Sequence, residues 1–248
     1  MIKNISDVDL VSVKQLHTDY YGRKILSYYI AYGTRYDFCR FFEIYDDGNK
    51  GYIVQFNAVM IIFSPSDVPL EELRDFIIMN KPFRVEAPCN IMGNISDICG
   101  YKMLRRTKFE FTDHKPDNFD LSRLDINPKL DDIYEILHEG FPSLVEYQLW
   151  MTENSHKIRR GLSKIYLYNN CTTATVIYDV DDHVLIGQVA TKKEARGKGY
   201  ARELLYWIGH SLSLEGKTVK LFALDYRESF YKEIGFKAVS AENVIQVE

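Results

Sequence analysis

The sequence contains no long apolar run. The longest uninterrupted ones, such as Ala58 to Phe63, are far shorter than the roughly 20 residues that a bilayer-spanning helix needs. The opening stretch, MIKNISDVDLVSVKQL, also lacks the apolar core and small-residue cleavage site of a secretory signal. We therefore expect no membrane partner and a cytoplasmic protein.

An excess of positive charge is missing too. The formal net charge is -4, whereas a general nucleic-acid binder usually carries a net basic face, so we expect no nucleic-acid partner. The cysteines are few and not closely spaced, which argues against a zinc site or a redox pair and leads us to expect no metal. They are Cys39, Cys89, Cys99 and Cys171. With only seven prolines and no low-complexity tract, the 248 residues suit one large domain or two ordinary ones.

The C-terminal half predicts the order ααβββαβαβ. Asn127 and Pro128 resemble an N-cap followed by a proline at the first helical position, and a second helix is expected over 143–159. The remaining predicted elements are strands at 164–168, 173–180 and 183–191, a helix after Gly199, a strand at 217–224, a helix at 226–235 and a strand at 237–247. This order predicts an α/β (α+β) fold, with a mixed and mostly antiparallel sheet flanked by helices.

The N-terminal half shows a weaker version of the same plan, ααβββαβ. The predicted elements are helices at 7–20 and 23–32, strands at 38–45 and within 52–63, a helix at 69–80 and a strand at 83–87. We therefore expect two similar domains in tandem, residues 1–115 and 120–248, with a boundary near 112–120. The N-terminal domain would be a degenerate copy, because its segment SPSDVPLEEL has no glycine and no cation.

The stretch TKKEARGKGYARELL, residues 191–205, carries the clearest functional signal. Gly197 and Gly199 lie among cations directly before an apolar-periodic helix. At a helix N-terminus, unpaired backbone N–H groups and the helix dipole together favour an anion. Glycines allow the backbone to touch a bulky phosphate there, so we expect an anion-binding loop.

Two common phosphate loops do not fit this stretch. A Walker loop needs Gly-Lys followed by Ser or Thr, but Gly199 is followed by a tyrosine. A dinucleotide fingerprint needs a small residue at the position of Arg202 and a parallel βαβ start, whereas this loop follows a predicted antiparallel meander.

The segment RGKGYA, Arg196 to Ala201, matches the R-x-x-G-x-A form of a coenzyme A pyrophosphate loop. With the preceding strand and the following helix it resembles the GNAT superfamily of acyl-CoA-dependent N-acyltransferases. SFYKEIGF, residues 229–236, resembles the second signature of that superfamily. The close resemblance covers about residues 120–245, and the N-terminal half resembles the family only in predicted topology.

The resemblance implies coenzyme-binding positions in this chain. Backbone amides of the loop would hold the pyrophosphate, at Arg196, Gly197, Lys198, Gly199, Tyr200 and Ala201. Arg196, Lys198 and Arg202 would add charge-assisted contacts. The preceding strand would separate from its neighbour and pair with the pantetheine arm at Gln188, Val189, Ala190 and Thr191. The Val189 N–H would stabilise the thioester oxyanion.

Tyr231 matches the family tyrosine that protonates the leaving thiolate. With reference pKa values near 10 for tyrosine and 8.5 for a thiol, that transfer costs roughly 2 kcal/mol, which is small beside the whole barrier. The bland alternative for Tyr231 is a core aromatic. We assign no general base: the strand offers Gln188, while Glu194, Glu146 and His156 are each more typical of a solvated surface.

Some positions depart from the family pattern. Lys193 stands where a proline is common, and an asparagine expected after the fifth strand is missing near Asp225. An acyl-cysteine mechanism through Cys171 is disfavoured. The resemblance implies an acetyl-CoA-dependent N-acetyltransferase that works by direct attack of an acceptor amine. The alternative is a non-catalytic acyl-CoA-binding sensor or interaction module. The acceptor (a small molecule or a peptide amine), the acyl length and the choice between monomer and homodimer stay open.

Overall fold

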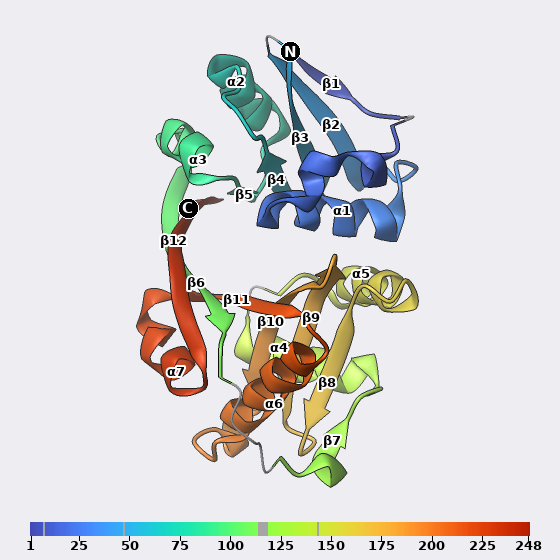
Figure 1. The fold of residues 1–248 in the computed structure, drawn as a ribbon, viewed down its shortest axis with the longest axis vertical. Helices are drawn as coiled ribbons and strands as arrows, with labels where there is room; N and C mark the ends of the chain where they lie inside the picture. Colours follow the sequence, from blue (N-terminus) through green and yellow to red (C-terminus); the bar gives the residue numbers. More distant parts are fainter. Residues whose placement is uncertain (7, 47, 114–118, 143) are drawn as a thin grey trace. The chain divides into compact units, whose positions relative to one another are not determined.

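The computed structural model describes residues 1–248 except 7, 47, 114–118 and 143, and of Asp225 it describes the backbone. The chain divides into two compact units. Unit 1 comprises Met1–Arg106 and Ala241–Glu248, and unit 2 comprises Thr107–Ser240 (Figure 1). The mixed, mostly antiparallel sheet structure with flanking helices confirms the predicted fold class.

In unit 1 a sheet is ordered β1-β2-β3-β4-β5-β12. Its antiparallel pairs give way to a parallel pair between β4 and β5. The elements are β1 (Ile2–Asn4), α1 (Tyr20–Tyr32), β2 (Cys39–Asp46), β3 (Asn49–Phe56), β4 (Val59–Phe63), α2 (Leu70–Asn80), β5 (Arg84–Glu86), α3 (Cys89–Ile95) and the start of β6 (Tyr101–Phe111).

The helix predicted over 7–20 is wrong in its described part. Two short 3-10 helices, Leu10–Ser12 and Lys14–His17, occupy that segment, while Asp7 lies outside the described residues. Aspartates explain the break. The Asp9 carboxylate accepts from the Val11 N–H and caps the first 3-10 helix, and Asp19 accepts from two N–H groups at the start of α1. Each Asp therefore ends one segment and begins another. The helix predicted at 23–32 is confirmed and extends back to Tyr20.

Unit 2 contains the order ααβββαβαβ that the sequence predicted. Its elements are β7 (Leu124–Asp125), α4 (Leu130–Gly140), α5 (Tyr147–Arg159), β8 (Lys164–Tyr168), β9 (Thr172–Val180), β10 (His183–Thr191), α6 (Tyr200–Leu214), β11 (Thr218–Leu224), α7 (Glu228–Glu233) and β12 (Phe236–Val247). The predicted N-cap at Asn127 is wrong, because α4 begins at Leu130. The Asn127 N–H instead donates to the Asp125 carboxylate in a local turn. The first residue predicted for the next helix, Ser143, lies outside the described residues.

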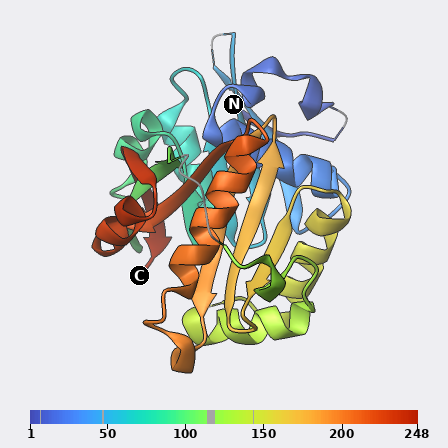
Figure 2. The same ribbon diagram turned by 60° about the horizontal axis from the view of Figure 1, so that its bottom comes forward.

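Helices cover both faces of the unit 2 sheet (Figure 2). On one face, α6 packs through buried residues such as Leu204 and Ile208 against β8 to β11 and against Phe109 and Phe111 of β6. On the other face, α4 and α5 pack against Ile165, Leu167 and Ala190. The segment between β10 and α6 therefore starts and ends in well-packed elements.

The compact units differ from the predicted ranges 1–115 and 120–248 at two strands. Residues 107–111 of β6 lie in unit 2, where Phe109 is fully buried. Residues 241–248 of β12 lie in unit 1, where Val244, Ile245 and Gln246 pair with β5. Part of the predicted boundary, 114–118, lies outside the described residues. Whether the predicted ranges are the functional domains stays a prediction.

Ile245 gives a test of this strand assignment. It is fully buried in the core of unit 1, so Ile245→Ala is expected to cost about 2–5 kcal/mol of stability. Hydrogen exchange should quicken in α2 and β5 and leave the described residues of unit 2 protected. Val247→Ala is the control, because Val247 is 37% exposed and its loss should cost about 0.5 kcal/mol or less. Faster exchange confined to residues 107–240 would contradict the assignment.

Within the described residues, no helix combines the length and apolar character that a membrane crossing requires.

Candidate functional site

The strand β10 leaves its parallel neighbour halfway along its length. His183 to Ile186 pair with Thr218 to Leu221 of β11, and the pairing ends there although both strands continue. From Gly187 to Thr191, β10 is paired on its β9 side. The separation implied by the resemblance is therefore present, and beyond Ile186 the other edge of β10 has no pairing with β11.

A β-bulge lies in the same part of β10. The register with β9 shifts between Gly187 and Ala190, and Gln188 has a positive φ of 49°. A left-handed backbone is uncommon for a residue other than glycine and costs free energy unless its surroundings fix it. Gly187 has no room for a side chain, since a Cβ there would lie 2.9 Å from Cγ1 of Ile177. The bulge is thus held by close packing.

The loop after β10 contains the two glycines singled out in the sequence. A 3-10 helix, Lys193–Ala195, precedes them, and Gly197 and Gly199 have φ values of 79° and 85°. Both glycines are exposed, and a Cβ at Gly197 would meet nothing within 4 Å. Glycine is therefore needed here for the left-handed backbone, as well as for access.

The N-terminus of α6 has no side-chain cap. Gly199 is the N-cap residue and supplies no side chain, while its carbonyl already accepts from the Glu203 N–H. Among the described residues, none accepts a hydrogen bond from the backbone N–H groups of residues 197–202. Several donors thus converge at the positive end of a 15-residue helix, which is the arrangement that binds a phosphate.

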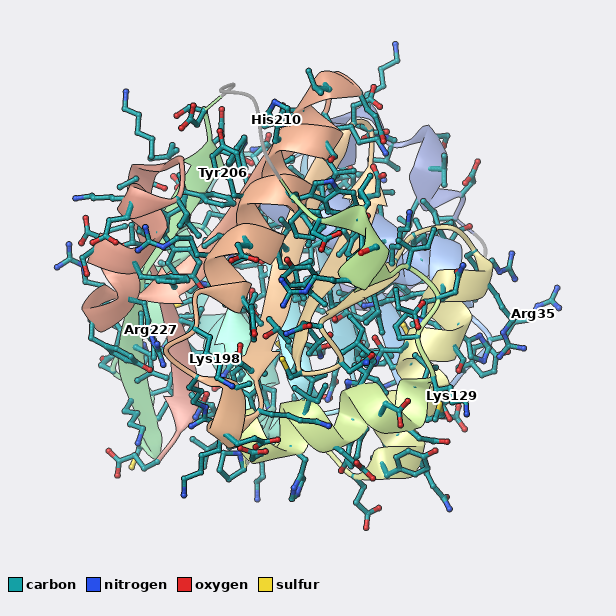
Figure 3. All side chains as sticks on the ribbon, turned by 90° about the horizontal axis from the view of Figure 1, so that it is seen from below. Arg35, Lys129, Lys198, Tyr206, His210 and Arg227 are labelled. Atoms are coloured by element: carbon teal, nitrogen blue, oxygen red, sulfur yellow. The ribbon has the colours of Figure 1, made fainter. Side chains whose placement is uncertain are left out.

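The cationic side chains of the loop have different roles. Arg196 donates to the Thr191 carbonyl at 3.0 Å and lies 3.6 Å from the Glu139 carboxylate. Arg202 pairs with Glu233 of α7. Lys198 is exposed at the start of α6 (Figure 3). Arg196 therefore fixes the loop to its own strand and to α4, and Arg202 connects α6 to α7, while Lys198 extends into solvent.

An aromatic cluster supports the start of α6 from beside the loop. The Tyr168 hydroxyl donates to the Glu203 carboxylate at 2.7 Å, and the guanidinium of Arg123 lies 5.3 Å from the ring centres of both Tyr168 and Tyr200. Burial and the Glu203 carboxylate raise the pKa of Tyr168 to about 12, so this hydroxyl stays a donor. Our sequence analysis missed Arg123 and Glu203. An acid in the first helical turn was a usable signal for Glu203, but no sequence spacing pointed to Arg123.

Tyr231 lies on α7 and is packed between aromatic rings. Its ring centre is 5.4 Å from that of Phe109 and 5.2 Å from that of Phe230. Burial raises the pKa of Tyr231 above its ordinary value, and the nearby Arg227 offsets only part of this effect. The phenol is therefore protonated at neutral pH and able to donate. The Arg202–Glu233 pair links the helix of Tyr231 to the helix that follows the glycine loop.

The other sequence candidates lie apart from this arrangement. Glu194 is exposed on the 3-10 helix, and Glu146 is the exposed N-cap residue of α5. Cys171 is buried, with its thiol 3.8 Å from the Tyr168 carbonyl. His156 lies in the last turn of α5. Within the described part of the chain, no three His, Cys, Asp or Glu side chains gather as a metal site.

The first turn of the unit 1 helix α2 carries acids and no glycine. Glu72, in the first turn of α2, accepts from the Ile2 N–H at 2.7 Å and pairs with the amino terminus at Met1. Its pKa is lowered by these contacts. The first turn of α2 thus differs from the start of α6, which follows two glycines, and the absence of a phosphate loop in unit 1 stays a prediction.

Comparisons with known proteins identify part of the chain. Residues 138–246 match the model of a family described as acetyltransferase (GNAT) domain. The C-terminal half therefore carries a GNAT acetyltransferase domain, which confirms the recognised resemblance for this half. No curated protein matches the chain.

Solved structures resemble the whole chain in fold. A putative acetyltransferase from Pyrococcus horikoshii aligns with a TM-score of 0.64 at 11% identity, over 100% of this chain and 89% of that one. A GCN5-related N-acetyltransferase from Sphaerobacter thermophilus aligns with a TM-score of 0.62 at 13% identity, over 99% and 95%. A glucosamine N-acetyltransferase region of a fungal multi-domain β-N-acetylglucosaminidase aligns with a TM-score of 0.61 at 14% identity, over 99% and 38%. At these identities the likeness concerns the fold, and it extends to the N-terminal half.

Proposed function

We propose, on the premise that residues 138–246 form a GNAT acetyltransferase domain, that this protein transfers an acetyl group from acetyl-CoA to an acceptor amine by direct attack. The observation that carries the proposal is the set of open backbone donors at residues 197–202, at the start of α6. Their surroundings fit a pyrophosphate, because two exposed glycines leave the backbone uncovered and Lys198 adds a free-standing positive charge.

In this proposal the exposed edge of β10 orients the acyl group. Backbone groups of Gln188, Val189, Ala190 and Thr191 pair with the pantetheine arm of acetyl-CoA where β11 has separated. The Val189 N–H is the proposed donor to the carbonyl oxygen on which charge develops as the amine attacks. Such a donor contributes most when it is fixed beforehand, and the packed bulge at Gly187 fixes this part of the strand.

Tyr231 is the proposed acid. The C–N bond forms first; then, as the C–S bond breaks, the Tyr231 hydroxyl gives its proton to the departing thiolate. The extra proton on the nitrogen passes to water. Two features support this role: the phenol is protonated at neutral pH, and α7 is tied to α6 through Glu233 and Arg202. The alternative is that Tyr231 is only an aromatic residue of the core, in which case removing its hydroxyl would not change turnover.

A second candidate function is an acyl-CoA-binding sensor without turnover. It is favoured by one feature of the sequence: from Val184 to Thr191, β10 carries no ionisable side chain that could act as a base. Thiol release from acetyl-CoA with a panel of amines separates the two functions. The enzyme releases thiol only when an acceptor is present, and the sensor binds the thioester and releases none.

Coenzyme binding is tested with a matched pair of glycine variants. Coenzyme A at 100 times its Kd should stabilise the parent protein by about 2.7 kcal/mol, measured as a rise in Tm. Gly199→Glu should abolish this rise, because a carboxylate would take the place of the phosphate. Gly216→Glu is the control: Gly216 also has a positive φ, 83°, and follows the other end of α6. It should keep the rise.

Two results would contradict the proposal. If coenzyme A leaves the Tm of the parent protein unchanged, both the enzyme and the sensor fail. If Gly216→Glu and Gly199→Glu lose the rise equally, the effect is one of general instability, and the loop is not the binding site.

A further inference from the structure

The side chain of Gln188 has an unused hydrogen-bonding group inside the protein. Its Oε1 is buried and has no hydrogen-bond partner among the described residues. A buried amide oxygen without a donor costs free energy, so such atoms are uncommon unless a ligand or ordered water completes them. Gln188 is also the residue of β10 that adopts a left-handed backbone, with φ of 49°. Strain and an unsatisfied oxygen thus coincide at one residue.

The position of Gln188 connects it to the proposed chemistry. It lies in the bulge between Gly187 and Ala190, just beyond the last residue of β10 that pairs with β11. The next residue, Val189, is the proposed donor to the acyl oxygen. An amine that attacks the acyl carbon must approach this same segment of strand, and it carries N–H groups that need an acceptor.

We propose that Gln188 Oε1 accepts a hydrogen bond from the acceptor amine, and that this acceptor is a weakly basic primary amine, substantially neutral at pH 7. The inference rests on the proposed function. An amide oxygen orients an N–H group but does not take its proton. The amine must therefore arrive neutral, and its proton leaves to water after the C–N bond has formed.

On the elements packed around β10, the described ionisable groups lie against another side chain, are exposed to solvent or are tyrosines. These elements are β9, β11, α4 and α6. On β9 and β11, Asp179 pairs with Lys217 and Lys220 pairs with Glu110. On α4, Asp131 binds Tyr147, and Glu139 binds the Lys193 N–H and Arg196. On α6, Arg202 pairs with Glu233, Glu203 binds Tyr168, and His210 stacks on Tyr206. On α4, Asp132, Glu135 and His138 are exposed, and Tyr134 is partly buried. Tyr178 of β9 is buried, and Tyr200 and Tyr206 of α6 are partly so.

The basicity of the substrate then controls the rate. An amine with a pKa of 10.4 is neutral in about one molecule in 2,500 at pH 7, whereas an α-amine with a pKa near 7.7 to 8.0 is neutral in roughly one in 6 to 11. The difference is about 200- to 400-fold. Amines with an electron-withdrawing group on the adjacent carbon, as in an α-amino amide, are the class that this site suits.

The test uses two acceptors that differ only in which nitrogen is free. One is a lysine amide blocked on its α-nitrogen, and the other is the same lysine amide blocked on its side-chain nitrogen. Both belong to a panel of primary amines of graded pKa. At pH 7 we expect kcat/KM to favour the α-amine by at least about tenfold, after the greater intrinsic nucleophilicity of the side-chain amine is counted. With the side-chain amine, kcat/KM should still rise about tenfold per pH unit between pH 7 and 9, whereas with the α-amine it should level near pH 8.

Variants of Gln188 test the residue itself. Gln188→Leu should lower kcat/KM for the α-amine by about 10- to 100-fold, with the rise in Tm caused by coenzyme A unchanged. Gln188→Glu adds a base and should narrow the preference for the α-amine. Thr175→Val is the matched control: Thr175 on β9, opposite Gly187, also has a buried oxygen without a partner, and its removal should leave kcat/KM unchanged.

Each outcome decides between the proposals. The inference is overturned if kcat/KM at pH 7 is equal or higher for the side-chain amine, or if Gln188→Leu leaves kcat/KM for the α-amine unchanged. In either case, binding of coenzyme A would still support the proposed coenzyme site. If coenzyme A binds but no amine of the panel causes thiol release, both this inference and the catalytic function are overturned in favour of the sensor. No binding of coenzyme A overturns the proposed function itself.

Discussion

Replacing Glu86 with glutamine is expected to lower the free energy of unfolding of unit 1 by about 3–5 kcal/mol. Glu86 is 3% exposed, and its Oε2 accepts from Lys24 Nζ at 2.8 Å and from Arg106 Nη2 at 3.0 Å. The variant keeps the shape of the side chain but leaves two cations in a buried site with less negative charge. Breaking one partner of a buried ionic group costs far more than breaking a surface pair, because the remaining charge cannot be solvated.

A surface pair in the same unit supplies the control. Glu43 pairs with Lys50 at 2.7 Å, and the side chain of Lys50 is 46% exposed. Glu43→Gln should cost about 0.2–1 kcal/mol. Urea unfolding followed by hydrogen exchange in α1 and β5 measures both variants. Equal costs for Glu86→Gln and Glu43→Gln would show that the buried cluster is hydrated enough to behave like the surface.

The cost of Glu86→Gln should also depend on pH. Burial alone would raise the pKa of Glu86, but Arg106 and Lys24 outweigh it and hold the pKa below the ordinary 4.5. The ionised carboxylate therefore stabilises the folded state fully above pH 4.5, and this contribution is lost as the pH falls below it. We expect the difference between the parent and Glu86→Gln to be largest near neutrality and to shrink in acid.

Replacing Tyr231 with phenylalanine is expected to lower kcat by about 100-fold or more, within the range that a positioned acid contributes. The variant deletes only the hydroxyl. The ring contacts with Phe109, Phe230 and Phe236 remain, so the Tm and the rise caused by coenzyme A should be unchanged. Because burial raises the pKa of Tyr231 above its ordinary value, its deprotonation should not reduce kcat in the parent protein between pH 6 and 9.

Tyr226 gives a matched control for this variant. It lies in the 3-10 helix directly before α7 and is 73% exposed, so Tyr226→Phe should change kcat by less than about twofold. Thiol release from acetyl-CoA, measured from pH 6 to 10 with saturating acceptor, gives kcat for all three proteins. If Tyr231→Phe keeps the kcat of the parent throughout this range, Tyr231 is a core aromatic and the thiolate takes its proton elsewhere.

The sequence predicted unit 2 better than unit 1, and the reasons are physical. In unit 2 the strands β8, β9 and β10 are separated by paired polar residues, Asn169-Asn170 and Asp181-Asp182, which adopt positive φ, and glycines lie before and after α6. In unit 1 the residues before α1 have apolar side chains at helical spacing, but Asp9 and Asp19 compete for the backbone N–H groups and divide the segment. Local capping there overrides periodicity.

The assignment of β6 and β12 was beyond sequence reasoning. The pattern of β12 predicted a strand, but nothing in Val244 or Ile245 indicates that their partner is β5, more than 150 positions earlier. Pairing partners of distant strands depend on the packing of complete sheets, which a local pattern does not encode.

The anion-binding loop could be predicted from the sequence because the features that define it are close together in the chain. Glycine at residues 197 and 199, the exposed backbone and the start of α6 lie within a few positions of one another, so the expectation of open donors could be formed from sequence alone. The ion-pair partners of Arg196 and Arg202 could not be predicted from the sequence, because Glu139 and Glu233 belong to other elements. The same holds for the unpaired oxygen of Gln188, which depends on its whole surroundings.

The strand that completes the unit 1 sheet follows the whole of residues 107–240 along the chain. During synthesis, β5 must therefore wait with an unpaired edge until the ribosome has delivered all of unit 2. Final closure of the N-terminal unit is thereby postponed to the end of translation of this region, and a contiguous gene fragment that encodes residues 1–106 would lack the strand that completes the unit 1 sheet.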